Sequence, residues 1–124
     1  MKTNNGKGVL RVFNATLCSF KGLKAAYKYE LAFRQELLLI ILLFPISFYL
    51  ARSKMHWLIL ITTLLLILFA EIINTALEAL ADKITLEYDE IIGRVKDLGS
   101  AAVFITLLIM LLVWGEAAIH KLFI

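Results

Sequence analysis

The longest apolar segment of the chain is residues 57–81, which read WLILITTLLLILFAEIINTALEALA. A membrane-spanning helix needs about 20 predominantly apolar residues, and this segment is long enough. Its carboxylate and carboxamide side chains are Glu71, Asn74 and Glu78, at positions i, i+3 and i+7. Because successive residues of a helix are rotated by about 100°, these three side chains fall on one face. The segment therefore predicts a transmembrane helix with one polar face.

Two shorter apolar runs flank this segment. Residues 37–51 carry no charge, but as a helix they would cover only about 22 Å, less than the roughly 30 Å hydrocarbon core. We therefore extend the first span to residues 36–52 and expect Pro45 to kink it. The third run begins at Leu98 and is also long enough to span. The predicted transmembrane helices are thus 36–52, 57–81 and 98–120, joined by a basic turn at 52–56 and a charged loop at 82–97.

The composition supports a single membrane domain over residues 1–124. Hydrophobic residues make up 61% of the chain, whereas about half is usual for a soluble domain. The formal net charge is +3, but the basic residues are not arranged as a stripe with interleaved aromatic residues. Nucleic-acid binding is therefore not expected. Cys18 is the only cysteine, so no intrachain disulfide can form.

Residues 9–35 predict an amphipathic helix that lies on the membrane surface. Apolar side chains recur every three or four residues from Leu10 to Tyr27, and basic side chains fall off that stripe. Gly22 is a candidate break within this helix. Residues 1–8 are polar and contain glycine, and we expect them to be disordered.

The distribution of lysine and arginine predicts the topology. These residues are concentrated before the first span, and three spans put the amino terminus and the 82–97 loop on the same side. The positive-inside rule makes that side the cytoplasm. The turn at 52–56 is also basic, but its excess of positive charge is smaller.

The intramembrane carboxylates are candidate functional groups, because each costs about 2.5–3.5 kcal/mol in a span. Glu71 and Glu78 are separated by about 10 Å along the helix, so we do not expect them to bind one metal ion together. Glu71 is placed to take a proton from a substrate in the bilayer or to relay protons in a transporter. Glu78, nearer the headgroups, suits a hard cation such as Mg²⁺. Each residue also has an alternative explanation without a catalytic role. Glu78 could be solvated, Glu71 could be a protonated structural residue, and Asn74 could make only an interhelical polar contact.

Polar residues next to the spans supply further candidates. Arg94, Lys96 and Asp97 could bind phosphates and position a metal, although most charged loops beside a membrane are simply solvated. A polar cluster precedes the first span, with interfacial anchoring as the alternative, and it consists of Glu30, Arg34, Gln35 and Glu36. Small side chains at residues 99–102 indicate close helix packing. The chain contains no Gly-x-x-x-x-Gly-Lys-[Ser/Thr] loop for phosphates.

Four strings together resemble one known family, the prokaryotic diacylglycerol kinases. They are KGLKAA at residues 21–26, ELAFRQE at 30–36, EIINTALE at 71–78 and KDLGSAAV at 96–103. They occur in the expected order, and the resemblance covers about residues 9–120. The pattern Glu-x-x-Asn-[Ser/Thr]-Ala-[Ile/Leu]-Glu is highly specific.

The resemblance implies an enzyme that phosphorylates the free hydroxyl of diacylglycerol with MgATP and yields phosphatidic acid. It also implies a homotrimer in the bacterial inner membrane, with active sites at the cytoplasmic interface between subunits. Glu71 would be the general base, Asn74 would lie beside the reacting groups, and Glu30 and Glu78 would hold Mg²⁺ on the nucleotide.

The resemblance further implies contacts to both substrates. Nucleotide contacts are implied for Arg11, Cys18, Glu30, Glu78, Glu87, Tyr88, Asp89, Lys96 and Asp97. Lipid-substrate contacts are implied for Arg11, Ser19, Arg34, Gln35, Glu71 and Ser100. Lys96 is expected to counter phosphate charge.

Three positions depart from the family pattern, and two rival functions are considered. Cys18 stands where an aromatic residue is expected, Asp89 stands where a histidine is expected, and Glu116 has no counterpart. An undecaprenol kinase would share the fold and the chemistry but use a polyprenol acceptor. A small proton-coupled exporter would also use a membrane-embedded glutamate, but it typically needs four spans.

Overall fold

The computed structural model describes residues 8–124, which form four helices and no strand. The disorder expected for residues 1–8 falls mainly on residues 1–7, which lie outside the described residues, whereas Gly8 directly precedes α1. The helices are α1 (Val9–Tyr29), α2 (Leu31–Leu50), α3 (Lys54–Ile84) and α4 (Glu90–Phe123). The predicted all-α architecture, one amphipathic helix followed by three apolar helices, is confirmed.

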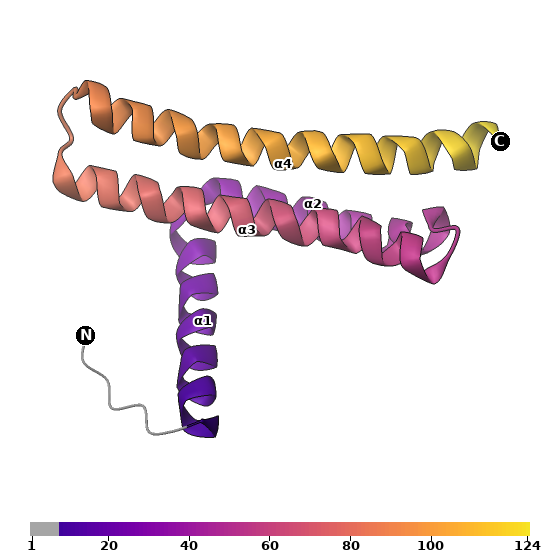
Figure 1. The fold of residues 1–124 in the computed structure, drawn as a ribbon, viewed down its shortest axis with the longest axis horizontal. Helices are drawn as coiled ribbons and strands as arrows, with labels where there is room; N and C mark the ends of the chain where they lie inside the picture. Colours follow the sequence, from indigo (N-terminus) through magenta and orange to yellow (C-terminus); the bar gives the residue numbers. More distant parts are fainter. Residues whose placement is uncertain (1–7) are drawn as a thin grey trace.

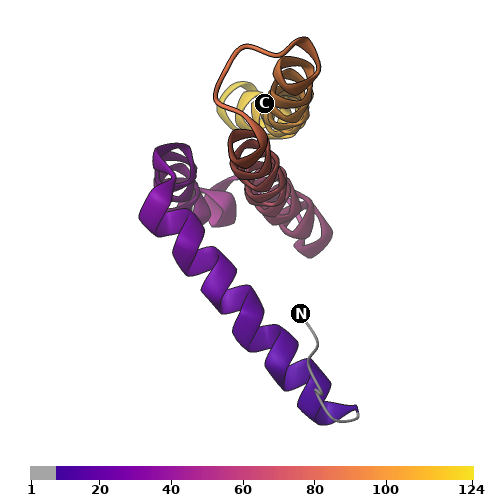
Figure 2. The same cartoon turned by 90° about the vertical axis from the view of Figure 1, so that its left-hand side faces the viewer.

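Three of these helices, α2, α3 and α4, lie lengthwise beside one another, while α1 leaves the bundle crosswise (Figures 1 and 2). Each of the three is long and apolar enough to cross a membrane. At about 1.5 Å per residue α2 is about 30 Å long, which matches the hydrocarbon core. By the same measure α3 and α4 are about 46 and 51 Å long, so both extend beyond that core.

The chain breaks between α1 and α2 at Glu30, not at Gly22, and the predicted helix over residues 9–35 is wrong in that respect. Glu30 has an extended backbone, with φ −117° and ψ 112°. The Arg34 guanidinium donates from Nη1 to the carbonyls of Tyr27 (2.7 Å) and Lys28 (3.1 Å). These bonds satisfy carbonyls that the end of α1 leaves without a donor. Gly22 stays helical because one glycine costs a helix only about 1 kcal/mol.

The connection between α3 and α4 is residues 85–89, much shorter than the predicted loop over residues 82–97. The Asp89 carboxylate accepts hydrogen bonds from the amides of Ile91 and Ile92, both at 3.0 Å, and so caps the first turn of α4. The charged residues beyond it are therefore helical. Their polarity indicated solvent exposure correctly, but it did not exclude a helix that continues past the membrane.

The turn at the opposite end is also shorter than residues 52–56. Ser53 caps α3 by accepting from the amide of His56 at 3.1 Å, so α3 begins at Lys54. α2 is a single helix across Pro45, and α4 ends at Phe123 rather than at residue 120.

The main packing seam runs between the antiparallel helices α3 and α4. Its apolar part buries Leu60, Leu64 and Ile67 of α3 against a row on α4 that consists of Met110, Trp114 and Ala117. The Trp114 indole Nε1 donates to Thr63 Oγ1 at 2.8 Å, which fixes the register of the two helices. Most other large apolar side chains face outward, as expected when lipid is the solvent.

Substitution of Leu64 by alanine tests this seam. Leu64 is 1% exposed, so the Leu64→Ala variant leaves a cavity and should lower the free energy of unfolding by about 2 kcal/mol or more. The neighbouring Leu65 is 59% exposed and serves as the matched control, with little expected change. The measurement is denaturant unfolding in lipid micelles, and equal effects of the two substitutions would contradict the proposed seam.

Candidate active site

The polar face of α3 is buried inside the bundle. Glu71 is 4% exposed and Asn74 is 8% exposed, whereas Glu78, one turn nearer the helix end, is half-buried. The predicted common face is therefore observed. The Asn74 Oδ1 atom has no hydrogen-bond partner within the described residues, and neither has the Thr75 hydroxyl. An interhelical hydrogen bond of Oδ1 thus does not account for Asn74, and both unpaired groups require another explanation.

Other carboxylates gather around Glu71. Glu30 at the junction of α1 and α2, Glu36 in the first turns of α2, and Glu78 all lie within electrostatic range of the Glu71 carboxylate. One oxygen of Glu36, Oε2, is buried without a partner among residues 8–124. Mutual repulsion makes such a group of carboxylates a favourable place for a cation.

Glu36 is the residue that sequence reasoning missed. It was grouped with the polar cluster before the first span but was not given a role at the site. The available signal was its place at the start of an apolar run, where a carboxylate must either reach the interface or face other polar groups. The packing of α2 against α3 decides between these possibilities, and that packing is not visible in a linear pattern.

The donor set fits Mg²⁺ that arrives with phosphates. Mg²⁺ keeps several waters and is usually held by one or two carboxylates together with substrate phosphates. Within residues 8–124 no group of three or more His, Cys, Asp or Glu side chains is placed to hold a metal ion alone. The two carboxylates expected from the sequence, Glu30 and Glu78, would match the number that such a shared site requires.

The start of α4 carries a second polar region. Lys96 Nζ donates to Asp82 Oδ1 at 2.5 Å and so ties α4 to the end of α3. A hollow of about 300 Å³ lies at the helix start, and its lining consists of Tyr88, Asp89, Glu90, Gly93, Arg94 and Asp97. Three of the predicted nucleotide contacts therefore share one hollow. The Asp89 carboxylate also caps the helix, which gives it a structural role as well.

The predicted site residues on α1 are not brought to Glu71 within one chain. Arg11, Cys18 and Ser19 are exposed on α1, of which only Ala26 is buried. Gln35 and Ser100 are exposed as well, and Arg34 is engaged with the end of α1. A single chain therefore presents the cluster of four carboxylates and the hollow at the start of α4. It does not enclose either of them with α1.

An apolar hollow of about 420 Å³ lies between the second half of α1 and α3. Its lining consists of Gly22, Ala25, Ala26, Tyr29, Glu30, Ile72, Thr75, Ala76 and Ala79. Small side chains on both helices leave this space open. Glu30 both lines the hollow and belongs to the cluster of carboxylates around Glu71. An apolar molecule in the hollow would therefore reach that cluster.

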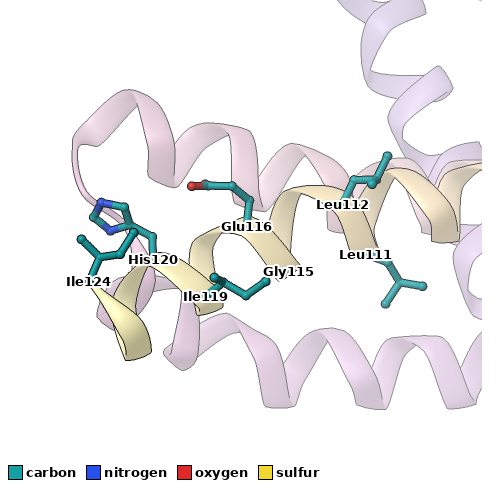
Figure 3. Close-up of a pocket in the computed structure, with 7 residues that line it drawn as sticks. All are labelled: Leu111, Leu112, Gly115, Glu116, Ile119, His120 and Ile124. Carbon is teal, nitrogen blue, oxygen red and sulfur yellow. The ribbon is translucent and has the colours of Figure 1, made fainter.

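A further hollow, of about 390 Å³, lies along the C-terminal part of α4 (Figure 3). Its polar groups are Glu116 and His120, and its other lining residues are apolar or glycine. The Glu116 carboxylate accepts two hydrogen bonds from the Arg52 guanidinium, at 2.8 and 3.2 Å. Glu116 therefore joins α4 to the turn between α2 and α3, at the end of the bundle away from the α4 start. We do not assign it to the active site.

The sequence is similar to known lipid kinases. The profile of the family described as Prokaryotic diacylglycerol kinase matches residues 17–117. A diacylglycerol kinase of Haemophilus influenzae is 43% identical over 108 residues, which cover 87% of this chain and 92% of that protein. The diacylglycerol kinase of Escherichia coli K12 is 40% identical and covers 90% and 91%, respectively. The Pseudomonas aeruginosa diacylglycerol kinase is 39% identical and covers 87% and 88%.

Substitution of Asp89 separates its capping role from any other role. Asp89→Ala leaves two amides of the first turn of α4 without an acceptor and should cost about 1 kcal/mol locally. Hydrogen exchange at Ile91 and Ile92 should then accelerate roughly fivefold, whereas Asp89→Asn, which keeps a capping oxygen, should change it little. Unchanged exchange in the alanine variant would show that the cap does not hold this turn.

Proposed function

The chain belongs to the prokaryotic diacylglycerol kinase family, and we propose that it transfers the γ-phosphate of ATP to the free hydroxyl of diacylglycerol. The observation that carries the proposal is Glu71, a nearly fully buried carboxylate within a helix long enough to span the membrane. A carboxylate at that depth reaches a hydroxyl that stays in the lipid phase. The named relatives support this acceptor, since all three are diacylglycerol kinases.

Glu71 is the general base of this reaction. Its carboxylate accepts the proton of the lipid hydroxyl as the hydroxyl oxygen attacks the γ-phosphorus. A bond forms between that oxygen and phosphorus, and the bond to the β-phosphate oxygen breaks, so that ADP leaves and phosphatidic acid forms. The proton remains on Glu71 until the site reopens to water. Catalysis rests mainly on positioning and charge neutralisation, as is usual for phosphoryl transfer.

Glu30 and Glu78 would hold the Mg²⁺ that accompanies ATP, which would there supply neutralisation of charge on the phosphates. Their place beside Glu71 brings the γ-phosphate near the base. Glu36 places a further carboxyl group beside Glu71, and its buried Oε2 atom has no partner among the described residues. Asn74 lies on the same face of α3 as Glu71, one turn away, and so stands beside the reacting groups.

Lys96 contributes positive charge toward the phosphates. The ion pair with Asp82 holds its side chain at the end of α3, where α3 extends beyond the membrane core. The nucleotide would lie beside Lys96, in the hollow that is lined by Tyr88, Asp89 and Asp97. Glu87 precedes these residues and would also contact the nucleotide. The apolar hollow between α1 and α3 would take an acyl chain of the lipid. Glu30, which lines this hollow, would connect it to the carboxylates around Glu71.

A homotrimer would complete this site. Within one chain the side chains of Arg11, Cys18 and Ser19 remain exposed on α1. A second copy of the chain can supply α1 to the carboxylates Glu30, Glu36, Glu71 and Glu78 of the first, and so bring in these residues. Gln35 of α2 and Ser100 of α4 are also exposed and would contact the lipid substrate. Arg34 keeps further guanidinium donors for the lipid while it contacts the end of α1.

We further propose that the protein lies in the bacterial inner membrane with a cytoplasmic amino terminus. All three named relatives are bacterial. The lysine-rich segment before the spans favours the cytoplasmic side. ATP is available on that side, and α3 and α4 carry the nucleotide residues there.

An undecaprenol kinase is the alternative within the same chemistry, since its acceptor is also a lipid hydroxyl. The names of the relatives favour diacylglycerol. A proton-coupled exporter is less well supported, because the three candidate spans found within residues 8–124 fall short of the four that such a protein typically needs.

Transfer of labelled γ-phosphate tests the proposed function. Purified protein in lipid micelles would receive MgATP with either diacylglycerol or undecaprenol. We expect label in phosphatidic acid, and Glu71→Gln should lower the rate by about 10²- to 10⁴-fold, the usual contribution of a general base. Glu116→Gln is the matched control, since it alters a carboxylate outside the site.

The possible results separate the hypotheses. Label only in undecaprenyl phosphate would keep the mechanism and change the acceptor. No label in either lipid from folded protein would overturn the kinase proposal. A Glu71→Gln variant with wild-type activity would remove this residue from the role of base.

A further inference from the structure

The helices α3 and α4 approach each other closely at Gly99. Gly99 is buried in α4, at the end of the seam nearest the charged residues. Ordinary helix formation does not explain a glycine here, since alanine is the better helix former by a clear margin. The explanation must therefore lie in what the missing side chain leaves room for.

That space is filled by Asn74. A Cβ atom placed on Gly99 would overlap Asn74 Oδ1, would lie 3.2 Å from Asn74 Cγ, and would touch a methyl group of Leu77 at 3.6 Å. The amide of Asn74 thus rests directly against the backbone of Gly99. Gly115 on the same helix has nothing within 4 Å of such a Cβ atom, so the close approach is a local feature and not a property of every glycine in α4.

The helices cannot easily separate to relieve this overlap. On one side of Gly99 the ion pair of Lys96 with Asp82 joins α4 to α3. On the other side Trp114 donates to Thr63 within the apolar seam. The movable group between these two anchors is the end of the Asn74 side chain, which can rotate away while the backbones stay in place.

The overlap therefore bears on the direction of the Asn74 amide. Oδ1 is buried against Gly99 without a hydrogen-bond partner among the described residues, an arrangement that costs free energy. Because Asn74 and Glu71 share one face of α3, the amide held in this way lies beside the base.

We propose that Gly99 is a positioning residue. Because it has no side chain, it leaves room for the Asn74 amide to lie in the orientation that the phosphoryl transfer requires. The inference rests on the proposed function, and it adds a residue of α4 that touches neither substrate. A side chain at position 99 would rotate Asn74 and leave the fold intact.

The test is Gly99→Ala in the full-length protein in lipid micelles, with Gly115→Ala as the matched control. We expect kcat to fall by up to about 100-fold, the size of effect that a displacement of about 1 Å can produce, with KM for MgATP and for diacylglycerol unchanged. Thermal stability should stay at the wild-type value. In an Asn74→Ala background, where the overlapping atoms are gone, Gly99→Ala should cause no further loss.

A spectroscopic measurement makes the test independent of activity. In protein labelled with ¹⁵N-asparagine, the side-chain amide signal that disappears in Asn74→Ala belongs to Asn74. This signal should shift in Gly99→Ala and not in Gly115→Ala. An unmoved signal, or a loss of kcat that adds to that of Asn74→Ala, would overturn the proposal. A shifted signal in protein that transfers no phosphate even as wild type would support the packing and overturn the proposed function instead.

Discussion

The cost of placing carboxylates inside a membrane constrains the whole molecule. Each such group costs about 2.5–3.5 kcal/mol at the centre of a span. Glu71 and Asn74 can stay on α3 because α2 and α4 cover that face and leave the outward surface apolar. Glu30, Glu36 and Glu78 lie within electrostatic range of this face, although like charges repel one another. The polar face of α3 thus acts as the centre around which the other helices are arranged.

The packing seam between α3 and α4 fixes the positions of these polar side chains. Its apolar part is anchored by Trp114 and Thr63, and its polar end by Lys96 and Asp82. Between these anchors the backbone of Gly99 approaches Asn74 closely. The same pair of helices therefore provides both the stability of the bundle and the arrangement of the polar groups. The hollow at the start of α4 lies at the same end of the helix as the ion pair.

Much of this arrangement could be predicted from the sequence, and the failures have physical reasons. The spans and the common face of Glu71, Asn74 and Glu78 follow from periodicity, which is a property of one helix. The α3–α4 connection was predicted too long because charge reports exposure and not backbone conformation. The break at Glu30 and the inward direction of Glu36 depend on packing between helices, which a linear pattern does not contain.

The division of roles between the two carboxylates of α3 is the central claim, and nucleotide binding tests it most directly. The affinity for a non-hydrolysable ATP analogue with Mg²⁺ would be measured by calorimetry for Glu71→Gln and Glu78→Gln in lipid micelles. A base acts only in the chemical step, so Glu71→Gln should bind the analogue as the wild type does. Glu78→Gln, which lacks a metal ligand, should bind at least about tenfold more weakly. Equal losses in the two variants, or an unchanged affinity in Glu78→Gln, would contradict the account.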